Sequence, residues 1–396
     1  MFYKIYFHNT ITSELQIRNT LSVKKIYYWS PFLSPIATCK AVINSAGSLT
    51  QFGSGYESSI LNFFGEFNRY DKEIKKKNIQ LIDFYNFDIA NILPYKGKIK
   101  SRFSFFIFFL LGLFPLTKVL KKNKPDFLII HLITSLPLML LLFFNFKTKF
   151  ILRISGYPRM NFFRKLLWKI TFKKIHLITC PTNNTLNYIK SLRLTDSSKI
   201  KLLYDPIINV KEINRKKQKE ISIKNFYLSV GRLTKQKNFM FLCEAFQKLV
   251  KKNKEIKLVI AGNGEEKNNI QKFIKINNLE NNIILLGYVS NIYPYFKASK
   301  GFILSSLWED PGFVLLEASF CRTLILSSNA WPGPVELIKD NYNGISFESN
   351  DMEHFLKKFP YLMDNSYSKK LKLNNLKLAK KFTIFNHYQS LIKLLN

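Results

Sequence analysis

The chain has 396 residues, of which 47% are hydrophobic and 22% are charged. That length exceeds one ordinary hydrophobic core, so we expect two folded domains of roughly 150–200 residues, and the composition excludes a disordered or fibrous chain. Lys and Arg number 61 against 26 Asp and Glu, a formal net charge of +35. Such a charge attracts nucleic acid, an anionic membrane surface or a phosphorylated small molecule. Because Asn, Ile and Phe are abundant as well, a general compositional bias explains part of it.

In the first half, short β-branched or aromatic runs alternate with segments long enough for helices, which predicts a parallel α/β sheet. The expected strands are residues 24–30, 79–85, 126–132, 149–155 and 175–180.

Two strongly apolar runs lie in this half, at residues 103–116 and 126–146. The first is shorter than the ~20 residues that a membrane-spanning helix needs, and Pro137 and His131 interrupt the second. We therefore favour a buried helix and a strand-helix unit over integral membrane segments. Shallow insertion of residues 103–116 into a bilayer surface is the alternative, because lysines flank the run and suit anionic headgroups. These flanking residues are Lys118, Lys121, Lys122 and Lys124.

Residues 209–222 are highly charged without an apolar period, and we interpret them as a domain linker. The strand pattern then restarts at residues 225–231, 256–262, 282–288, 301–306 and 323–328. We therefore predict an N-terminal domain over 1–208, a second domain over 223–380 and a C-terminal helix over 381–396 that packs back on the first domain. The fold class is α/β, with two Rossmann-like parallel-sheet domains that face each other across a ligand-binding cleft.

The segment "SVGRLTKQKN", residues 229–238, ends a predicted strand at Gly231 and then supplies Arg232 and Lys237. Glycine permits a sharp turn, and the guanidinium and ammonium groups suit a phosphate-bearing ligand. A solvated basic loop explains the same residues. The next strand end, "LVIAGNGEE", carries Gly262 in a G-x-G pattern that fits a tight turn as well as it fits a ligand site.

The stretch "SLWEDPGFVLLEASFCRTLIL", residues 306–326, places Glu309 and Glu317 on either side of a Pro-Gly break. We expect Glu309 on a loop and Glu317 in a helix that starts near Gly312, whose free N–H groups suit a diphosphate. Eight residues of helix rise by ~12 Å, too far for a paired acid and base, so the glutamates are better explained as two separate ligand contacts. A chance pair with a solvated Glu317 is the alternative. A second Gly- and Pro-rich loop with Glu336 follows, at residues 327–347, and is expected to help close the pocket.

Together these phrases, with "IILLGYVS" and "ELIKDNYNGISF", resemble family 4 of the retaining glycosyltransferases, which have the GT-B architecture, over roughly residues 225–350. The resemblance implies that Arg232 and Lys237 hold the donor diphosphate. It implies that Glu309 lies near the donor sugar and Glu317 on the ribose. The remaining donor-side residues that it implies are Gly231, Gly262, Gly287, Tyr288, Gly312, Phe313 and Val314.

The N-terminal half departs from the family pattern. The usual early Gly-Gly loop is replaced by "SPFLSPIAT", residues 30–38, and the strand-end histidine of many members is absent from "LRISGYP", residues 152–158. His131, on another strand, is a candidate acceptor-side catalytic group and equally a core or cleft-wall residue.

The resemblance implies a hexosyltransferase that needs no cofactor or metal; the sequence agrees in having no D-x-D motif. It would move a sugar from a nucleotide diphosphate sugar to a hydroxyl acceptor, with retention. A saccharide or lipid-linked saccharide in cell-surface polysaccharide synthesis is the expected acceptor. The four cysteines, Cys39, Cys180, Cys243 and Cys321, have the scattered spacing of reduced cytosolic thiols, so we expect a cytoplasmic enzyme, peripheral at the inner face of the membrane.

Two alternatives remain from the sequence. Among enzymes, a nucleotide-sugar epimerase or a phosphorylase shares the two-lobed architecture. Outside enzymes, a net charge of +35 also fits a nucleic-acid-binding protein. The aromatic residues lie in apolar runs instead of alternating with Lys and Arg, so we expect no nucleic-acid partner.

Overall fold

The computed structural model describes residues 23–32, 37–85, 98–158, 160–363 and 365–396. The first 22 residues of the predicted N-terminal domain and the middle of segment 30–38 lie outside this range. The chain divides into two compact units. The first consists of Met1–Arg153, Met160–Ile178 and Leu395–Asn396, and the second of Ile154–Arg159 and Thr179–Leu394.

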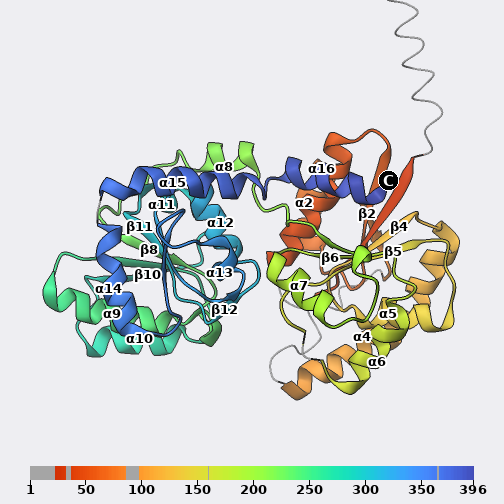
Figure 1. Cartoon of the computed structure of the whole chain (residues 1–396), viewed down its shortest axis with the longest axis horizontal. Helices are drawn as coiled ribbons and strands as arrows, with labels where there is room; N and C mark the ends of the chain where they lie inside the picture. Colours follow the sequence, from red (N-terminus) through yellow and green to blue (C-terminus); the bar gives the residue numbers. More distant parts are fainter. Residues whose placement is uncertain (1–22, 33–36, 86–97, 159, 364) are drawn as a thin grey trace, which may run out of the picture. The chain divides into compact units, whose positions relative to one another are not determined.

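A parallel seven-stranded sheet has the order β3-β2-β1-β4-β5-β6-β7 (Figure 1). Central strand β1 pairs on one side with β2, at Ile26 and Ser58, and on the other with β4, at Ile26 and Phe127. The five predicted strands are present, whereas β2 and β7 were not foreseen. The strands are β1 (Lys24–Trp29), β2 (Tyr56–Asn62), β3 (Gln80–Asp83), β4 (Phe127–Ile130), β5 (Lys149–Arg153), β6 (Leu177–Cys180) and β7 (Ile200–Leu202).

Five α-helices accompany this sheet within the described part of the first unit. They are α2 (Ala37–Phe52), α3 (Asp71–Lys76), α4 (Lys98–Asn123), α5 (Ser135–Phe143) and α6 (Phe162–Thr171). The apolar run 103–116 lies inside α4, and run 126–146 divides into β4 and α5, as a strand-helix unit would. None of the helices in the described part of the chain has the length and apolar character needed to cross a membrane.

The second unit is built on a six-stranded parallel sheet with the order β10-β9-β8-β11-β13-β15. Its first five strands in chain order fall where the sequence predicts them, and β15 was missed. The strands are β8 (Tyr227–Val230), β9 (Leu258–Ala261), β10 (Ile283–Gly287), β11 (Gly301–Leu304), β13 (Ile325–Ser328) and β15 (Ile345–Phe347). A separate two-stranded sheet joins β12 (Trp308–Glu309) and β14 (Trp331–Pro332).

Helices cover both faces of the six-stranded sheet (Figure 1). Along β9, Leu258 and Ile260 enter the core beneath α9, α10 and α14, while Val259 enters the core beneath α11, α12 and α13. Such burial on both faces is typical of parallel sheets and explains the uninterrupted apolar runs. The α-helices that follow residue 180 are α7 (Asn183–Ser191), α8 (Val210–Lys216), α9 (Phe239–Lys252), α10 (Lys267–Ile276), α11 (Tyr293–Ala298), α12 (Phe313–Phe320), α13 (Pro334–Leu337), α14 (Met352–Lys358), α15 (Asn365–Lys380) and α16 (Ile384–Leu395). Of these, α7 contacts β7 of the seven-stranded sheet.

Helices flank the predicted second domain on both sides. Within the range interpreted as a linker, residues 210–216 form α8, whose N-cap Asn209 accepts from the Glu212 amide and whose Ile213 is buried. At the other end, α16 ends at Leu395, and the Lys24 side chain donates to the Leu395 carbonyl at 2.8 Å within the first unit.

The carboxyl edge of the six-stranded sheet is closed by backbone contacts between strand-end loops. The Gly231 amide donates to Ala261 at 3.0 Å, and the Gly262 amide donates to Gly287 at 2.7 Å. Gly262 has a φ of +150°, and a Cβ at this position would lie 1.8 Å from the Gly231 carbonyl oxygen. The loops therefore approach each other as closely as backbone allows, because residue 262 has no side chain.

We expect Gly262→Ala to lower the free energy of unfolding by about 2–4 kcal/mol, because the φ angle is unfavourable for alanine and the added Cβ would overlap the Gly231 carbonyl oxygen. Gly231→Ala is the matched control, since a Cβ there meets its nearest neighbours at an ordinary 3.5 Å and should cost less than about 1 kcal/mol. Urea unfolding followed by circular dichroism measures both. Equal losses for the two variants would contradict this account of the edge.

Candidate functional site

The loop after β8 brings Lys237 to the carboxyl edge of the sheet. Residues 235–237 form a single 3₁₀ turn, and Asn238, with a φ of 53°, reverses the chain so that α9 begins at Phe239. Arg232 lies exposed on the same loop. The Lys237 side chain, by contrast, is only 14% exposed. The two predicted phosphate-binding cations therefore lie in different environments.

Lys237 Nζ contacts Glu309 Oε1 in an ion pair, and the Ser306 hydroxyl donates to the same carboxylate oxygen at 2.9 Å. The Glu309 side chain is 9% exposed. A charge so far removed from water is stable only beside a partner and hydrogen-bond donors, which Lys237 and Ser306 provide. The sequence placed Glu309 and Lys237 in one pocket but did not show that they pair.

Further contacts join the Lys237 loop to the loop after β11. The Ser305 hydroxyl donates to the Lys237 carbonyl at 2.9 Å. The Leu307 amide donates to the Gln236 carbonyl at 2.8 Å, and Gln236 Nε2 donates to the Trp308 carbonyl at 2.8 Å. Three hydrogen bonds to backbone carbonyls therefore join the two loops that carry the ion pair.

Helix α12 begins where the Pro-Gly break predicts. Its N-cap, Gly312, has a φ of 91°, in the left-handed region that favours glycine. Phe313 and Val314, at the helix start, are half-buried, while Leu315 and Leu316 are buried in the core. The backbone amides of the first helical turn, which have no partner within the helix, therefore begin at Phe313, four residues after Glu309.

Glu317 lies in the second turn of α12 and is half-buried. The hydroxyl of Tyr293, a buried residue of α11, donates to Glu317 Oε1 at 3.1 Å. Burial, and then the Glu317 carboxylate, raises the pKa of the Tyr293 phenol, so the phenol stays a hydrogen-bond donor at neutral pH. Glu309 and Glu317 thus have different partners on different elements, an arrangement suited to two separate contacts.

The Gly- and Pro-rich loop at 327–347 is tied directly to the Glu309 loop. Strands β12 and β14 pair at Glu309 and Pro332, and the Gly333 amide donates to the Glu309 carbonyl at 2.9 Å. A Cβ on Gly333 would lie 2.4 Å from the Pro311 carbonyl oxygen. Glycine at 333 therefore allows the two loops to touch along their backbones.

Two acidic residues beside these loops bind residues near the start of α7, within the second unit. Asp310 accepts from the Gly156 amide and from the hydroxyls of Thr182, at 3.2 Å, and Thr185, at 3.0 Å. Glu336 accepts from the backbone amides of residues 183 and 184 at 2.9 and 2.8 Å. These contacts were not predicted from the sequence, although the N-cap pattern "TNNT" at 182–185 is a signal for an anion-binding helix start.

The remaining predicted residues are spread over both units. Gly287, with a φ of +70°, ends β10, and Tyr288 beyond it is 79% exposed. His131 follows β4 in the sheet of the first unit, where it is 9% exposed and its ring centroid lies 6.1 Å from that of Tyr28. Its acceptor-side role remains a prediction.

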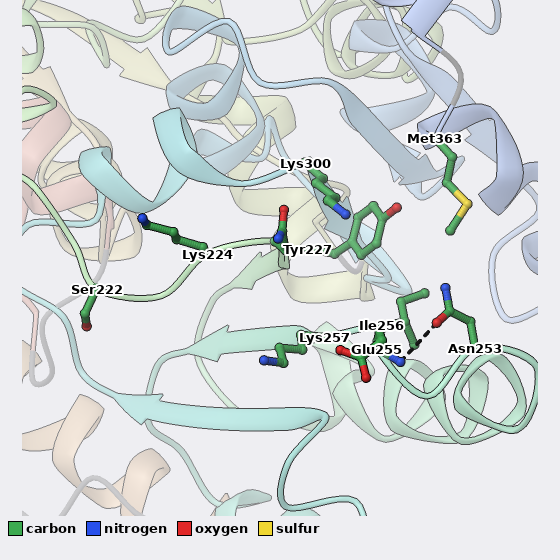
Figure 2. A pocket seen from close by; sticks show the side chains of 10 residues that line it. Ser222, Lys224, Tyr227, Asn253, Glu255, Ile256, Lys257, Lys300 and Met363 are labelled. Atoms are coloured by element: carbon green, nitrogen blue, oxygen red, sulfur yellow. Dashed lines mark hydrogen bonds between the residues drawn. The ribbon is translucent and has the colours of Figure 1, made fainter.

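A surface hollow of about 490 Å³ lies away from these residues, at the amino ends of β8, β9 and β11 (Figure 2). Its lining includes Lys224, Glu255 and Lys300, together with the buried residues Tyr227 and Ile256. The donor-side residues predicted from the sequence lie instead toward the opposite, carboxyl edge of this sheet. Within the described residues, no group of three or more His, Cys, Asp or Glu side chains is placed to hold a metal ion.

Residues 210–380 match the family described as glycosyl transferases group 1. The chain is 29% identical over 320 residues to an uncharacterized glycosyltransferase of Methanocaldococcus jannaschii, covering 74% of each protein.

A second relative is the GalNAc-alpha-(1->4)-GalNAc-alpha-(1->3)-diNAcBac-PP-undecaprenol alpha-1,4-N-acetyl-D-galactosaminyltransferase of Campylobacter jejuni. The chain is 27% identical to it over 361 residues, which cover 90% of this chain and 94% of the relative.

Among solved structures, the fold is similar to that of Anabaena HepE in complex with UDP and glucose, with a TM-score of 0.71 at 14% identity. The match covers 94% of this chain and 99% of HepE. The predicted architecture of two parallel-sheet α/β domains of the GT-B type is thereby confirmed.

A double-mutant cycle tests the buried ion pair. Lys237→Met should be strongly destabilising because it leaves the Glu309 carboxylate buried without its cation, and Glu309→Gln should relieve much of that loss in the double variant. We expect a coupling energy of about 1–3 kcal/mol by urea unfolding.

The matched control is the Lys216–Glu212 pair on α8 of the same unit, whose side chains are 35% and 27% exposed. The double-mutant cycle of this pair should give a coupling energy of no more than about 0.5 kcal/mol. Similar coupling energies in the two cycles would mean that Glu309 does not depend on Lys237 in the folded chain.

Proposed function

We propose that the protein is a glycosyltransferase that takes its sugar from a nucleotide diphosphate sugar and transfers it with retention of anomeric configuration, in keeping with the match of residues 210–380 to the glycosyl transferases group 1 family. The observation that carries the proposal is the assembly at one sheet edge of the Lys237–Glu309 ion pair, the start of α12 and Glu317. The assembly offers cationic groups and amides to a diphosphate, and carboxylates to hydroxyl groups.

In this proposal, Arg232, Lys237 and the amides of Phe313 and Val314 bind the donor diphosphate. An ammonium group has three donors, so Lys237 can keep its bond to Glu309 and still donate to a phosphate oxygen. As charge develops on the leaving diphosphate, these fixed donors stabilise it without reorganising. Gly231, Gly262 and Gly287 keep the floor of the site free of side chains.

The two glutamates bind hydroxyl groups at different places along the donor. Glu317 accepts hydrogen bonds from the ribose, while the Tyr293 hydroxyl, which donates to Glu317 Oε1 at 3.1 Å, holds the carboxylate in position. Glu309 accepts from the transferred sugar and stabilises positive charge that develops there. The acceptor hydroxyl attacks the same face of the sugar that the diphosphate leaves, and a leaving phosphate oxygen takes its proton, so no metal and no side-chain base is essential. If a side chain assists, His131 is the candidate.

The proposed acceptor is a saccharide or a lipid-linked saccharide used in cell-surface polysaccharide synthesis. The name of the Campylobacter jejuni relative specifies an acceptor linked to undecaprenol through a diphosphate. An acceptor of that kind lies in a membrane, and the net charge of +35 favours a position at an anionic inner membrane face.

Donor binding can be measured first, by thermal shift with UDP-, GDP- and ADP-sugars. A donor at 100 times its dissociation constant stabilises the fold by about 2.7 kcal/mol. Glu317→Ala should weaken the best donor by roughly 10- to 100-fold, since it removes charge-assisted hydrogen bonds. Glu353→Ala, an exposed carboxylate on α14, is the control. The Glu353→Ala control should show the same donor-induced thermal shift as the parent protein. If Glu317→Ala shows that same shift, the ribose assignment is wrong.

The stereochemistry of transfer can be followed by proton NMR of the product, using the best donor, a saccharide acceptor and an excess of EDTA. We expect the product to keep the anomeric configuration of the donor and the rate to be unchanged by EDTA. An inverted product, or activity restored only by added metal, would refute the corresponding part of the proposal. In a parallel reaction without acceptor, an accumulating epimer of the donor would indicate an epimerase instead.

A further inference from the structure

Helix α6 in the first unit exposes a continuous apolar face. Phe162 is 75% exposed and Phe163 79%, and Leu166 and Ile170 on the same helix are 47% and 45% exposed. With an advance of about 100° per residue, these four side chains fall within an arc of about 100°. A contiguous face of this kind on a folded protein marks an interaction surface.

The opposite side of α6 is packed firmly against the rest of its unit, so the exposure of the apolar face does not result from a poorly packed helix. Trp168 is 4% exposed and stacks on Phe172, with ring centroids 4.8 Å apart. Asn161 caps the helix start by accepting from the Arg164 amide at 2.8 Å. After the helix, Lys174 donates to the Leu141 carbonyl of α5 at 2.6 Å.

Cations border the apolar face. Lys165 and Lys169 are exposed, and their positions on the helix lie beside Phe162, at one edge of the apolar arc. Arg164 and Lys173 are exposed as well. Between residues 98 and 195 the sequence contains a single acidic residue, Asp126, so the surroundings of α6 add positive charge with almost nothing to offset it.

The two neighbouring helices also expose apolar side chains. Helix α5, which contacts α6, ends at Phe143, which is 70% exposed. Helix α4 contacts α5 and exposes Leu110 and Phe114, at 55% and 78%. Figure 1 shows the three helices grouped at one side of the first unit. The apolar surface is therefore not confined to one element.

We propose that α6 is a membrane-docking helix that lies in the plane of an anionic phospholipid bilayer, with Phe162, Phe163, Leu166 and Ile170 inserted at the headgroup boundary. Ten residues of helix extend about 15 Å, a length for lying on a bilayer and not for crossing it. Helices that lie in a membrane interface insert aromatic and aliphatic side chains from one face. The lysines that border this face extend outward to the lipid phosphates. A protein partner is disfavoured because the face has no polar side chain within its arc.

This inference deepens the proposed function, since it gives the enzyme a surface through which to reach a lipid-linked acceptor. It places a membrane contact on α6 in addition to residues 103–116, for which the sequence leaves shallow insertion open. Those residues lie in α4, where Leu110 and Phe114 are exposed and Gly112 and Leu116 are buried. The α6 segment "FFRKLLWKIT" contains no long apolar run, so its apolar face becomes evident only in the helix.

The test is co-sedimentation of the full chain with vesicles, in the absence of donor and acceptor. Vesicles of phosphatidylcholine alone are compared with vesicles of phosphatidylcholine and phosphatidylglycerol. The parent protein should bind the anionic vesicles and bind the neutral ones at least about tenfold more weakly, and salt should weaken the anionic binding.

The variant Phe162→Gln/Phe163→Gln/Leu166→Gln should lower binding to anionic vesicles at least about tenfold, because three inserted side chains are lost. Its control is Ile276→Gln/Leu373→Gln/Phe385→Gln, three exposed apolar residues on other helices, which should bind as the parent does. Circular dichroism and the melting temperature of each variant show that the fold is retained.

The charge contribution is tested by Lys165→Gln/Lys169→Gln, which should weaken anionic binding by about fivefold for each charge removed. Lys251→Gln/Lys252→Gln on α9, an exposed pair, is its control and should have little effect. Neither pair is part of the proposed donor site.

Three results would overturn the inference: a parent protein that does not bind anionic vesicles, an α6 triple variant that binds as well as the parent, or equal losses in variant and control. Sedimentation velocity adds a fourth: a parent dimer that the α6 variant dissociates, without vesicle binding, would make this face an interface between copies of the chain. Because no donor is present, these outcomes do not depend on glycosyl transfer. Transfer to a water-soluble saccharide acceptor, which the α6 variants should retain, tests the proposed function separately.

Discussion

The buried ion pair between Lys237 and Glu309 is the interaction on which the site of the second unit depends. Two loops that leave different strands, β8 and β11, have to stay in contact for the pair to form, and a carboxylate only 9% exposed is costly without its cation. The pair therefore fixes the loop that leads into α12. It also keeps an ammonium group at the sheet edge in a defined position before any anion arrives, so little side-chain entropy remains to be lost on binding.

Much of the second unit could be predicted from the sequence because its strands are buried on both faces. A run such as Leu258–Ala261 has no polar interruption, and Gly262 marks its end. The start of α12 was predictable for a similarly local reason, the Pro-Gly break before Phe313. The short strand Ile345–Phe347 was missed because three residues give too weak a pattern.

What the sequence could not reveal depends on residues far apart in the chain. Tyr293 and Glu317 are 24 positions apart and meet only because α11 and α12 cover the same sheet face. The contacts of Asp310 with Thr182 and Thr185 cross more than 120 positions. The exposed face of α6 was hidden for another reason: its apolar residues are interspersed with Arg164, Lys165 and Lys169, so a search for apolar runs passes over a pattern that only helical periodicity makes continuous.

The pairing of β12 with β14 has a consequence for motion. The Gly333 amide binds the Glu309 carbonyl at 2.9 Å, and the Gly333 backbone lies against Pro311. Neither loop can leave the sheet edge without breaking bonds to the other, so the two form one cooperative opening unit. Their backbone amides would then exchange with solvent deuterium at matched rates, and a ligand held by either loop would slow exchange in both.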